Sequence, residues 1–135
     1  MFIHLGGLPV LSNLSHFLCM HTNKKPITFS IGSLNVRGLR VKSKRKAIMR
    51  QAINHFDCVM LQDTHIDGKI SPQVSKEWNG SWAFANNRSN KGGVATYIND
   101  EKKAQYLIND SEAYDNGKGS IIGRTIQAGP IKLYL

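Results

Sequence analysis

The stretch that decides the fold runs from Ile27 to His65 and reads ITFSIGSLNVRGLRVKSKRKAIMRQAINHFDCVMLQDTH. At its start, apolar residues alternate with small or polar ones over 27–34, which predicts a strand with one face toward a core. A basic, amphipathic segment follows. The unbroken apolar run inside 57–62 then predicts a second strand that is covered on both faces. The order strand, helix, strand predicts a crossover unit with two parallel strands.

The middle segment predicts a helix from about Lys44 to His55, with Ser43 as its N-cap. One side is apolar and should face the core: Ile48, Met49, Ala52, Ile53 and Phe56. The other side should be basic: Arg40, Lys42, Lys44, Arg45, Lys46 and Arg50. Positive charge at a helix start opposes the macrodipole by about a few tenths of a kcal/mol per residue. Its density here therefore indicates either contacts to phosphate or a solvated face.

Both predicted strands are followed by residues suited to a metal-assisted site. Asn35 comes after the first strand and Asp63 after the second. Because parallel strands joined by a crossover end at one edge of a sheet, the two residues should converge there. The alternative for Asp63 is a carboxylate that only caps a loop.

The remaining chain predicts mostly strands. Residues 66–79 are interpreted as an irregular connection, and 81–85 with 94–98 as an antiparallel hairpin. Further strands are expected at 105–108, 120–127 and 131–135, with a loop at 109–118 and a turn at 128–130. Residues 1–26, broken by glycine, proline, serine and asparagine, are interpreted as an extension outside a domain formed by 27–135.

Composition limits the class of protein. A chain of 135 residues with 41% hydrophobic content is enough for one packed domain. A net charge of +9 favours a polyanionic partner such as nucleic acid over a cationic one, although a basic surface without a partner has the same charge. The two cysteines, Cys19 and Cys58, form no disulfide framework, which is typical of a reducing intracellular setting. No apolar run approaches membrane-spanning length, so we expect a soluble protein without a membrane partner.

The motifs, taken in chain order, resemble the endonuclease/exonuclease/phosphatase family, and most closely the endonuclease domain of LINE-type (non-LTR) retrotransposons. The resemblance begins with Leu34-Asn35-Val36-Arg37-Gly38-Leu39 and the basic helix, and continues with Leu61-Gln62-Asp63-Thr64-His65. Later features agree in order: Trp78, Trp82, Lys91-Gly92-Gly93-Val94-Ala95 and Gly123-Arg124. It covers about residues 27–135.

The resemblance implies an α/β fold, the N-terminal half of a four-layer sandwich with two mainly antiparallel sheets and helices outside. It also implies a hydrolase that uses Mg²⁺ or Mn²⁺ to cut a DNA strand. Asn35 would position the phosphate or an active-site carboxylate, and Asp63 takes the place of the family's metal-binding glutamate. Aspartate keeps an oxygen ligand but ends about 1.5 Å short of a glutamate's reach, so weaker or water-mediated metal binding is expected.

The family's remaining catalytic motifs do not occur in this sequence: Tyr-Ala-Pro, Asp-x-Asn and the Ser-Asp-His that carries its catalytic histidine. Cleavage needs a base, a stabilised leaving oxygen and several fixed metal ligands. We therefore expect a truncated copy or partial gene product that is inactive alone, with its second sheet largely absent and an apolar sheet face uncovered. His65 should anchor a loop or lie in the interior rather than transfer a proton.

Two alternatives to the endonuclease fragment remain open. One is a non-enzymatic basic module that binds DNA or another nucleic acid. Its contacts would lie within Arg37–Arg50. This segment includes the residues that the endonuclease interpretation assigns to phosphate: Arg37, Arg40, Lys42, Lys44 and Arg45. The other alternative is a phosphatase or phospholipid-hydrolase branch of the same family.

Overall fold

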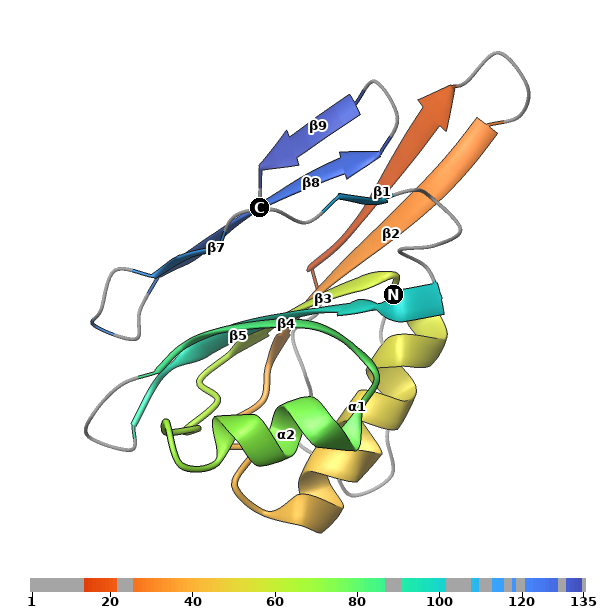
Figure 1. Ribbon diagram of the computed structural model, residues 1–135. Helices are drawn as coiled ribbons and strands as arrows, with labels where there is room; N and C mark the ends of the chain where they lie inside the picture. The colour runs from red at the N-terminus through yellow and green to blue at the C-terminus, as the bar shows by residue number, and fades with distance from the viewer. Residues whose placement is uncertain are drawn as a thin grey trace.

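The computed structural model describes residues 14–21, 26–86, 91–101, 108–109, 113–115, 118, 121–128 and 131–134. The described elements, in chain order, are β1 (Leu14–His21), β2 (Pro26–Asn35), α1 (Lys42–His55), β3 (Cys58–Gln62), α2 (Ser71–Glu77), β4 (Gly80–Ala85), β5 (Val94–Asn99), β6 (Ile108–Asn109), β7 (Ala113–Asp115), β8 (Ile122–Ala128) and β9 (Ile131–Tyr134). Together they form a mixed α/β fold (Figure 1).

The larger sheet has the strand order β1-β2-β3-β5-β4. β2 and β3 pair in parallel, as the predicted crossover requires, and the other neighbours pair antiparallel. The strands expected at 27–34 and 57–62 and the hairpin expected at 81–85 and 94–98 are therefore confirmed. The sequence of each strand is alternating or continuously apolar because its side chains pack against another layer on one or both faces.

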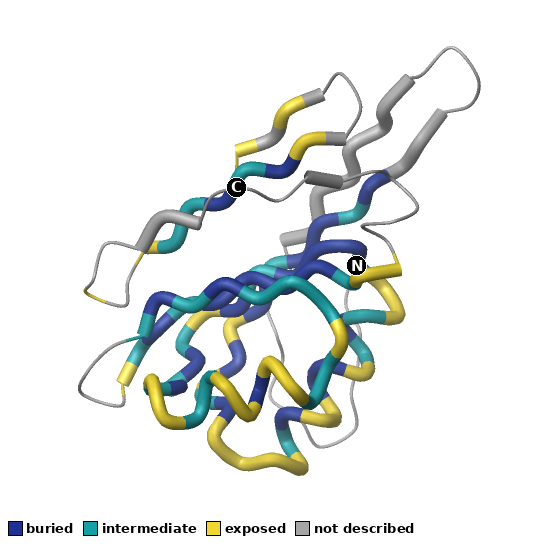
Figure 2. Tube along the Cα trace, viewed as in Figure 1, coloured by how far each residue is buried: buried dark blue, intermediate teal, exposed yellow. Residues whose placement is uncertain are grey.

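Both helices cover one face of this sheet (Figure 1), and the main core lies between them and the strands (Figure 2). From α1, the core takes Ile48, Met49 and Ala52. Ile53 and the C-cap residue Phe56 pack against it, so the predicted apolar stripe is confirmed. The sheet and the connecting loops supply Leu34, Val36, Leu39, Val59, Leu61, Ile66, Ala95 and Tyr97, and α2 supplies Val74.

The predicted start of the first helix was wrong. The helix begins at Lys42, its N-cap is Val41, and no side chain caps it. The backbone N–H of Arg45 donates to the carbonyl of Val41 at 3.0 Å, which closes the first turn before Ser43 could act as an N-cap.

Three further elements were not expected. α2 lies in the supposed irregular connection, and β7 lies in the expected loop at 109–118. β1 lies within residues 1–26 and pairs with β2 along its length, from Leu14 opposite Ser33 to His21 opposite Pro26. The strands expected at 120–127 and 131–135 correspond to β8 and β9, which pair antiparallel. Residues 105–107 of another expected strand lie outside the described part of the chain.

A second, smaller sheet is built around β8, which pairs with β6, β7 and β9. It lies on the side of the larger sheet away from the helices (Figure 1). Arg124 of β8 joins the two sheets, since its Nη1 donates to the Ser81 carbonyl and to Thr96 Oγ1, both at 3.0 Å.

The apolar residues on that face are covered only in part, since Met60 and Val94 are half-buried. Phe29, Cys58 and Ile98 alternate with residues that face the helices, and all three are fully buried. Ile126 of β8 is buried as well. The expected uncovered apolar face is therefore found only in part, because β7 and β8 pack over β4 and β5. No described helix combines the length and the apolar character needed to cross a membrane.

Candidate functional site

The parallel strands β2 and β3 end side by side. Asn35 is the register partner of Gln62, and Asp63 follows directly. The amide of Val36 donates to the Gln62 carbonyl at 2.9 Å, so the pairing continues past the strand ends. Asn35 and Asp63 consequently lie at one edge of the sheet, as the crossover predicted. We call this region, Asn35–Leu39 with Gln62–His65, the strand-end edge.

Backbone hydrogen bonds hold the loops of the strand-end edge together. Gly38 and Leu39 donate to the carbonyls of Asp63 and Thr64, each at 2.7 Å. On the other side, Thr64 and His65 donate to the carbonyls of Gly93 and Gly92, at 3.0 and 2.7 Å. The loops after β2 and β3 and the loop before β5 therefore form one hydrogen-bonded unit. Such pairing fixes the position of side chains that loops alone would leave variable.

Strained backbone is concentrated at this edge. In the described part of the chain, the non-glycine residues with positive φ are Arg37 at 46°, Asp63 at 56° and His65 at 54°. Each such residue costs on the order of 1–3 kcal/mol and persists only where its surroundings impose it. Two of the three belong to the Asp63-Thr64-His65 loop, which makes this edge a candidate site on structural grounds.

The Asp63 carboxylate is held by a neighbouring imidazole. His65 Nε2 lies 2.7 Å from Asp63 Oδ1, and the two side chains are 34% and 37% exposed. The His65 backbone is also bonded to Gly92, so the expected loop-anchoring role of His65 is confirmed. Only one carboxylate oxygen of Asp63 takes part in this contact, which leaves the second oxygen for another ligand.

Asn35 is exposed, and its Oδ1 accepts from the Arg37 amide at 3.3 Å. Its amide nitrogen can still donate to an anion. A Mg²⁺ ion commonly takes one or two protein carboxylates and completes its shell with water and substrate phosphate. Asp63 fits such an ion, with Asn35 beside it. The described residues contain no group of three or more histidine, cysteine, aspartate or glutamate side chains that could hold a metal ion.

The structure separates the five basic residues that the sequence grouped together. Arg37, Arg40 and Lys42 are exposed, and Arg40 forms an ion pair with Asp67 at 3.3 Å. Lys44 is half-buried and donates to the Arg37 carbonyl at 2.7 Å. All four lie on the loop and first helical turn that follow Asn35, so positive charge borders the strand-end edge.

The placement of Arg45 on the basic outer face was wrong. Arg45 is only 2% exposed, and its guanidinium forms two hydrogen bonds to the Glu77 carboxylate, at 2.6 and 2.7 Å. Residue type and helical spacing could not predict this, because Glu77 is distant in sequence and belongs to the helix that the sequence did not predict. The bond to Arg45 lowers the pKa of the Glu77 carboxyl, although its burial acts in the opposite direction.

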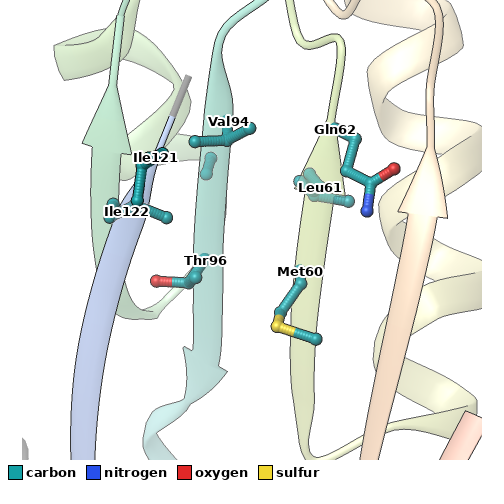
Figure 3. A pocket seen from close by; sticks show the side chains of 8 residues that line it. Met60, Leu61, Gln62, Val94, Thr96, Ile121 and Ile122 are labelled. Carbon is teal, nitrogen blue, oxygen red and sulfur yellow. The ribbon is translucent and has the colours of Figure 1, made fainter. Parts of the chain in front are cut away.

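A cavity of about 220 Å³ lies near this edge, between β3, β5 and the start of β8 (Figure 3). It is lined by Met60, Leu61, Gln62, Val94, Ala95, Thr96, Ile121 and Ile122. Gln62 and Thr96 are its polar side chains, and the Gln62 amide donates to Ser33 Oγ at 3.0 Å. No sequence signal could predict this cavity, because its walls come from strands far apart in the chain.

No protein-family model matches this chain, and no curated protein matches it.

Proposed function

We propose that this chain carries the N-terminal part of a metal-dependent phosphodiesterase site of the DNA-endonuclease type. The observation that supports it is the placement of Asn35 and Asp63 after neighbouring parallel strands, on a rigid edge bordered by basic residues. The fold that goes with this proposal is the four-layer α/β sandwich, in which the larger sheet with α1 and α2 would be one half.

The roles follow from the chemistry of each side chain. Asp63 would hold Mg²⁺ or Mn²⁺ through the oxygen that His65 does not contact. A metal ion held there would supply Lewis-acid polarisation of a phosphoryl oxygen. The Asn35 amide would donate to a phosphate oxygen, and Arg37 and Lys42, both exposed, would neutralise the phosphates next to it.

We do not propose that the 135 residues cleave DNA alone. Asp63 is the single carboxylate of the described strand-end edge, and its imidazole neighbour is engaged with it. The sequence contains none of the Tyr-Ala-Pro, Asp-x-Asn or Ser-Asp-His motifs that would supply the base and the stabilised leaving oxygen. Binding of metal and of a phosphodiester is thus the activity expected of this chain.

A second candidate is a nucleic-acid-binding module without catalysis. It is favoured by the exposed basic residues Arg37, Arg40 and Lys42, which need no metal to contact phosphate. A phosphatase or phospholipid-hydrolase specificity would use the same edge. Competition of bound DNA by inositol phosphates at equal ionic strength separates that branch from the nuclease branch.

Site-resolved Mn²⁺ binding tests the proposal. With a short DNA duplex present, paramagnetic Mn²⁺ should broaden the backbone amide signals of Asn35 and Asp63 more than those of distant residues. Asp63→Ala should abolish the broadening, and Asp100→Ala, at an exposed site, should preserve it. Broadening that survives in Asp63→Ala would contradict the metal role.

Nicking of supercoiled plasmid provides the second test. The purified chain should nick no DNA in Mg²⁺, but should retard DNA at low salt. If the chain nicks DNA, and if EDTA and Asp63→Ala each abolish the nicking, then the 135 residues suffice for catalysis. Retardation without site-specific Mn²⁺ binding would favour the module without catalysis.

A further inference from the structure

Arg45 contacts two separate parts of the molecule at once. Its Nε and Nη2 donate to the two carboxylate oxygens of Glu77 on α2. Its Nη1 donates to the carbonyls of Leu39 at 2.7 Å and Arg40 at 3.0 Å. One planar guanidinium can serve both groups because its donors diverge in a fixed fork. Arg45 thus connects α2 with the loop that leads into α1.

The same loop is held from its other side by the strand-end edge. The Leu39 amide donates to the Thr64 carbonyl, and the Leu39 carbonyl accepts from Arg45, so one residue is fixed at both ends. Gly38 donates to the Asp63 carbonyl in the same way. The loop is therefore clamped between the buried guanidinium and the segment that carries Asp63.

The clamped loop carries the exposed cations. Arg37 precedes the clamped residues, Arg40 is one of them, and Lys42 begins α1. We infer that Arg45 is a positioning residue for phosphate binding, which holds these cations at a fixed place beside Asn35 and Asp63 without touching the phosphate. The inference rests on the proposed function, since it assigns Arg45 a part in the same site.

Replacing Arg45 with lysine separates the effect of net charge on DNA binding from the effect of holding the loop in place. Arg45→Lys keeps the net charge of +9, so long-range attraction of DNA is preserved. A single ammonium cannot reproduce the planar fork that meets Glu77 and two carbonyls together. Arg50→Lys is the matched control, because Arg50 is exposed on the same helix and the charge is again unchanged. Glu77→Gln tests the connection to α2 and leaves the groups that bond the loop carbonyls in place.

The experiment measures DNA affinity by fluorescence anisotropy at one salt concentration, and amide hydrogen exchange at Gly38 and Leu39, well below the unfolding temperature. Arg45→Lys should weaken DNA binding by about threefold to tenfold, as loss or displacement of phosphate contacts does. It should also speed exchange at both amides. Arg50→Lys should change neither quantity, and Glu77→Gln should lower stability with DNA affinity kept within about twofold of wild type.

The outcomes separate the inference from the proposed function. If wild-type protein binds DNA and Arg45→Lys matches Arg50→Lys in affinity and exchange, the inference is overturned while the proposed function stands. If Glu77→Gln weakens DNA binding as much as Arg45→Lys, Arg45 acts only through the contact with α2, which also overturns it. If wild-type protein binds no DNA, the proposed function fails, and hydrogen exchange still decides whether Arg45 positions the loop.

A measurement on unmodified protein covers the case in which Arg45→Lys does not fold. Guanidinium signals of Arg45, Arg37 and Arg40 can be followed by NMR during a DNA titration. A positioning residue keeps its signals nearly unshifted while those of Arg37 and Arg40 move. Shifts of Arg45 as large as those of Arg37 would show direct phosphate contact and overturn the inference.

Discussion

His65 Nε2 lies 2.7 Å from Asp63 Oδ1, so the imidazole holds the carboxylate across a loop in which both residues have positive φ. The other ring nitrogen, Nδ1, lies against Gly38, where a Cβ atom would approach it to 3.1 Å. Gly38 itself has φ of 87°, a conformation that suits glycine. The orientation of Asp63 therefore depends on a glycine in a different loop, through the histidine between them.

Gly38→Ala should destabilise the protein by roughly 1–3 kcal/mol for two reasons. Alanine is strained in the left-handed conformation of this residue, and its methyl group would crowd the His65 ring. Urea denaturation measures the effect. Gly68→Ala is the matched control, since only its own chain neighbours lie within 4 Å of the position of its Cβ. It should change stability by less than about 0.5 kcal/mol. Equal losses in the two variants would contradict the crowding described at Gly38.

The pKa of Glu77 lies below its ordinary value of 4.5, chiefly because Arg45 donates a hydrogen bond to it. A lowered folded-state pKa means that the ion pair contributes full stability above about pH 4.5 and loses it as pH falls through the folded-state value. Glu77→Gln should cost about 1–3 kcal/mol at neutral pH. The free-energy difference between wild type and variant, from urea titrations across pH, should shrink below pH 4.5. A difference independent of pH would exclude the ion pair as its source.

Burial raises the pKa of Tyr97 from 10.0 to about 12, with Asp100 and Glu101 adding repulsion. Its phenol donates to the Asn79 carbonyl at 2.7 Å. Because the folded-state pKa is raised, the neutral phenol of Tyr97 contributes its full share of the folding stability below pH 10, and this share is lost as pH rises toward 12. Between pH 10 and 12, the free energy of unfolding should therefore fall less steeply for Tyr97→Phe than for wild type. Tyr134→Phe, at a 75% exposed position, should behave as wild type.

Thr96→Val should weaken the junction between the sheets. The Thr96 hydroxyl is buried and accepts from Arg124 Nη1, so valine removes an acceptor of a charged donor inside the protein. A loss of about 1–3 kcal/mol follows. Thr125→Val, at a half-buried position of β8, is the control and should cost less. Chemical denaturation measures the free energy of unfolding of both variants. A Thr96→Val protein as stable as wild type would show that the Arg124–Thr96 hydrogen bond does not stabilise the fold.

Lys42→Ala should lower the dependence of DNA affinity on salt. An exposed lysine that contacts one phosphate contributes about 0.9 to the slope of log K against log salt concentration, so the slope should fall by about that amount. Lys76→Ala, on the exposed side of α2, should leave the slope unchanged. A similar slope change in both variants would indicate diffuse attraction instead of a defined contact.

Much of the larger sheet could be predicted because its signals are local. The alternation over 27–34, the apolar run within 57–62 and the stripe of Ile48, Met49 and Ala52 each reflect the repeat of one element against one packed layer. The sequence did not predict the less regular elements. α2 has only seven residues, with Pro72 in its first turn, where proline is tolerated although in sequence it suggests an irregular connection. β1 was missed because glycine, proline and polar residues interrupt the segment around it.

The sequence by itself determined the crossover, the placement of Asn35 and Asp63 at one sheet edge, and the basic segment that follows Asn35. Only the tertiary structure decided which cations face solvent, that Arg45 is buried against Glu77, that His65 holds Asp63, and that β8 packs over β4 and β5. The physical reason is the range of the interactions. Periodicity arises from neighbours within a few residues, whereas a buried ion pair or a cavity wall depends on chain segments that meet only after folding.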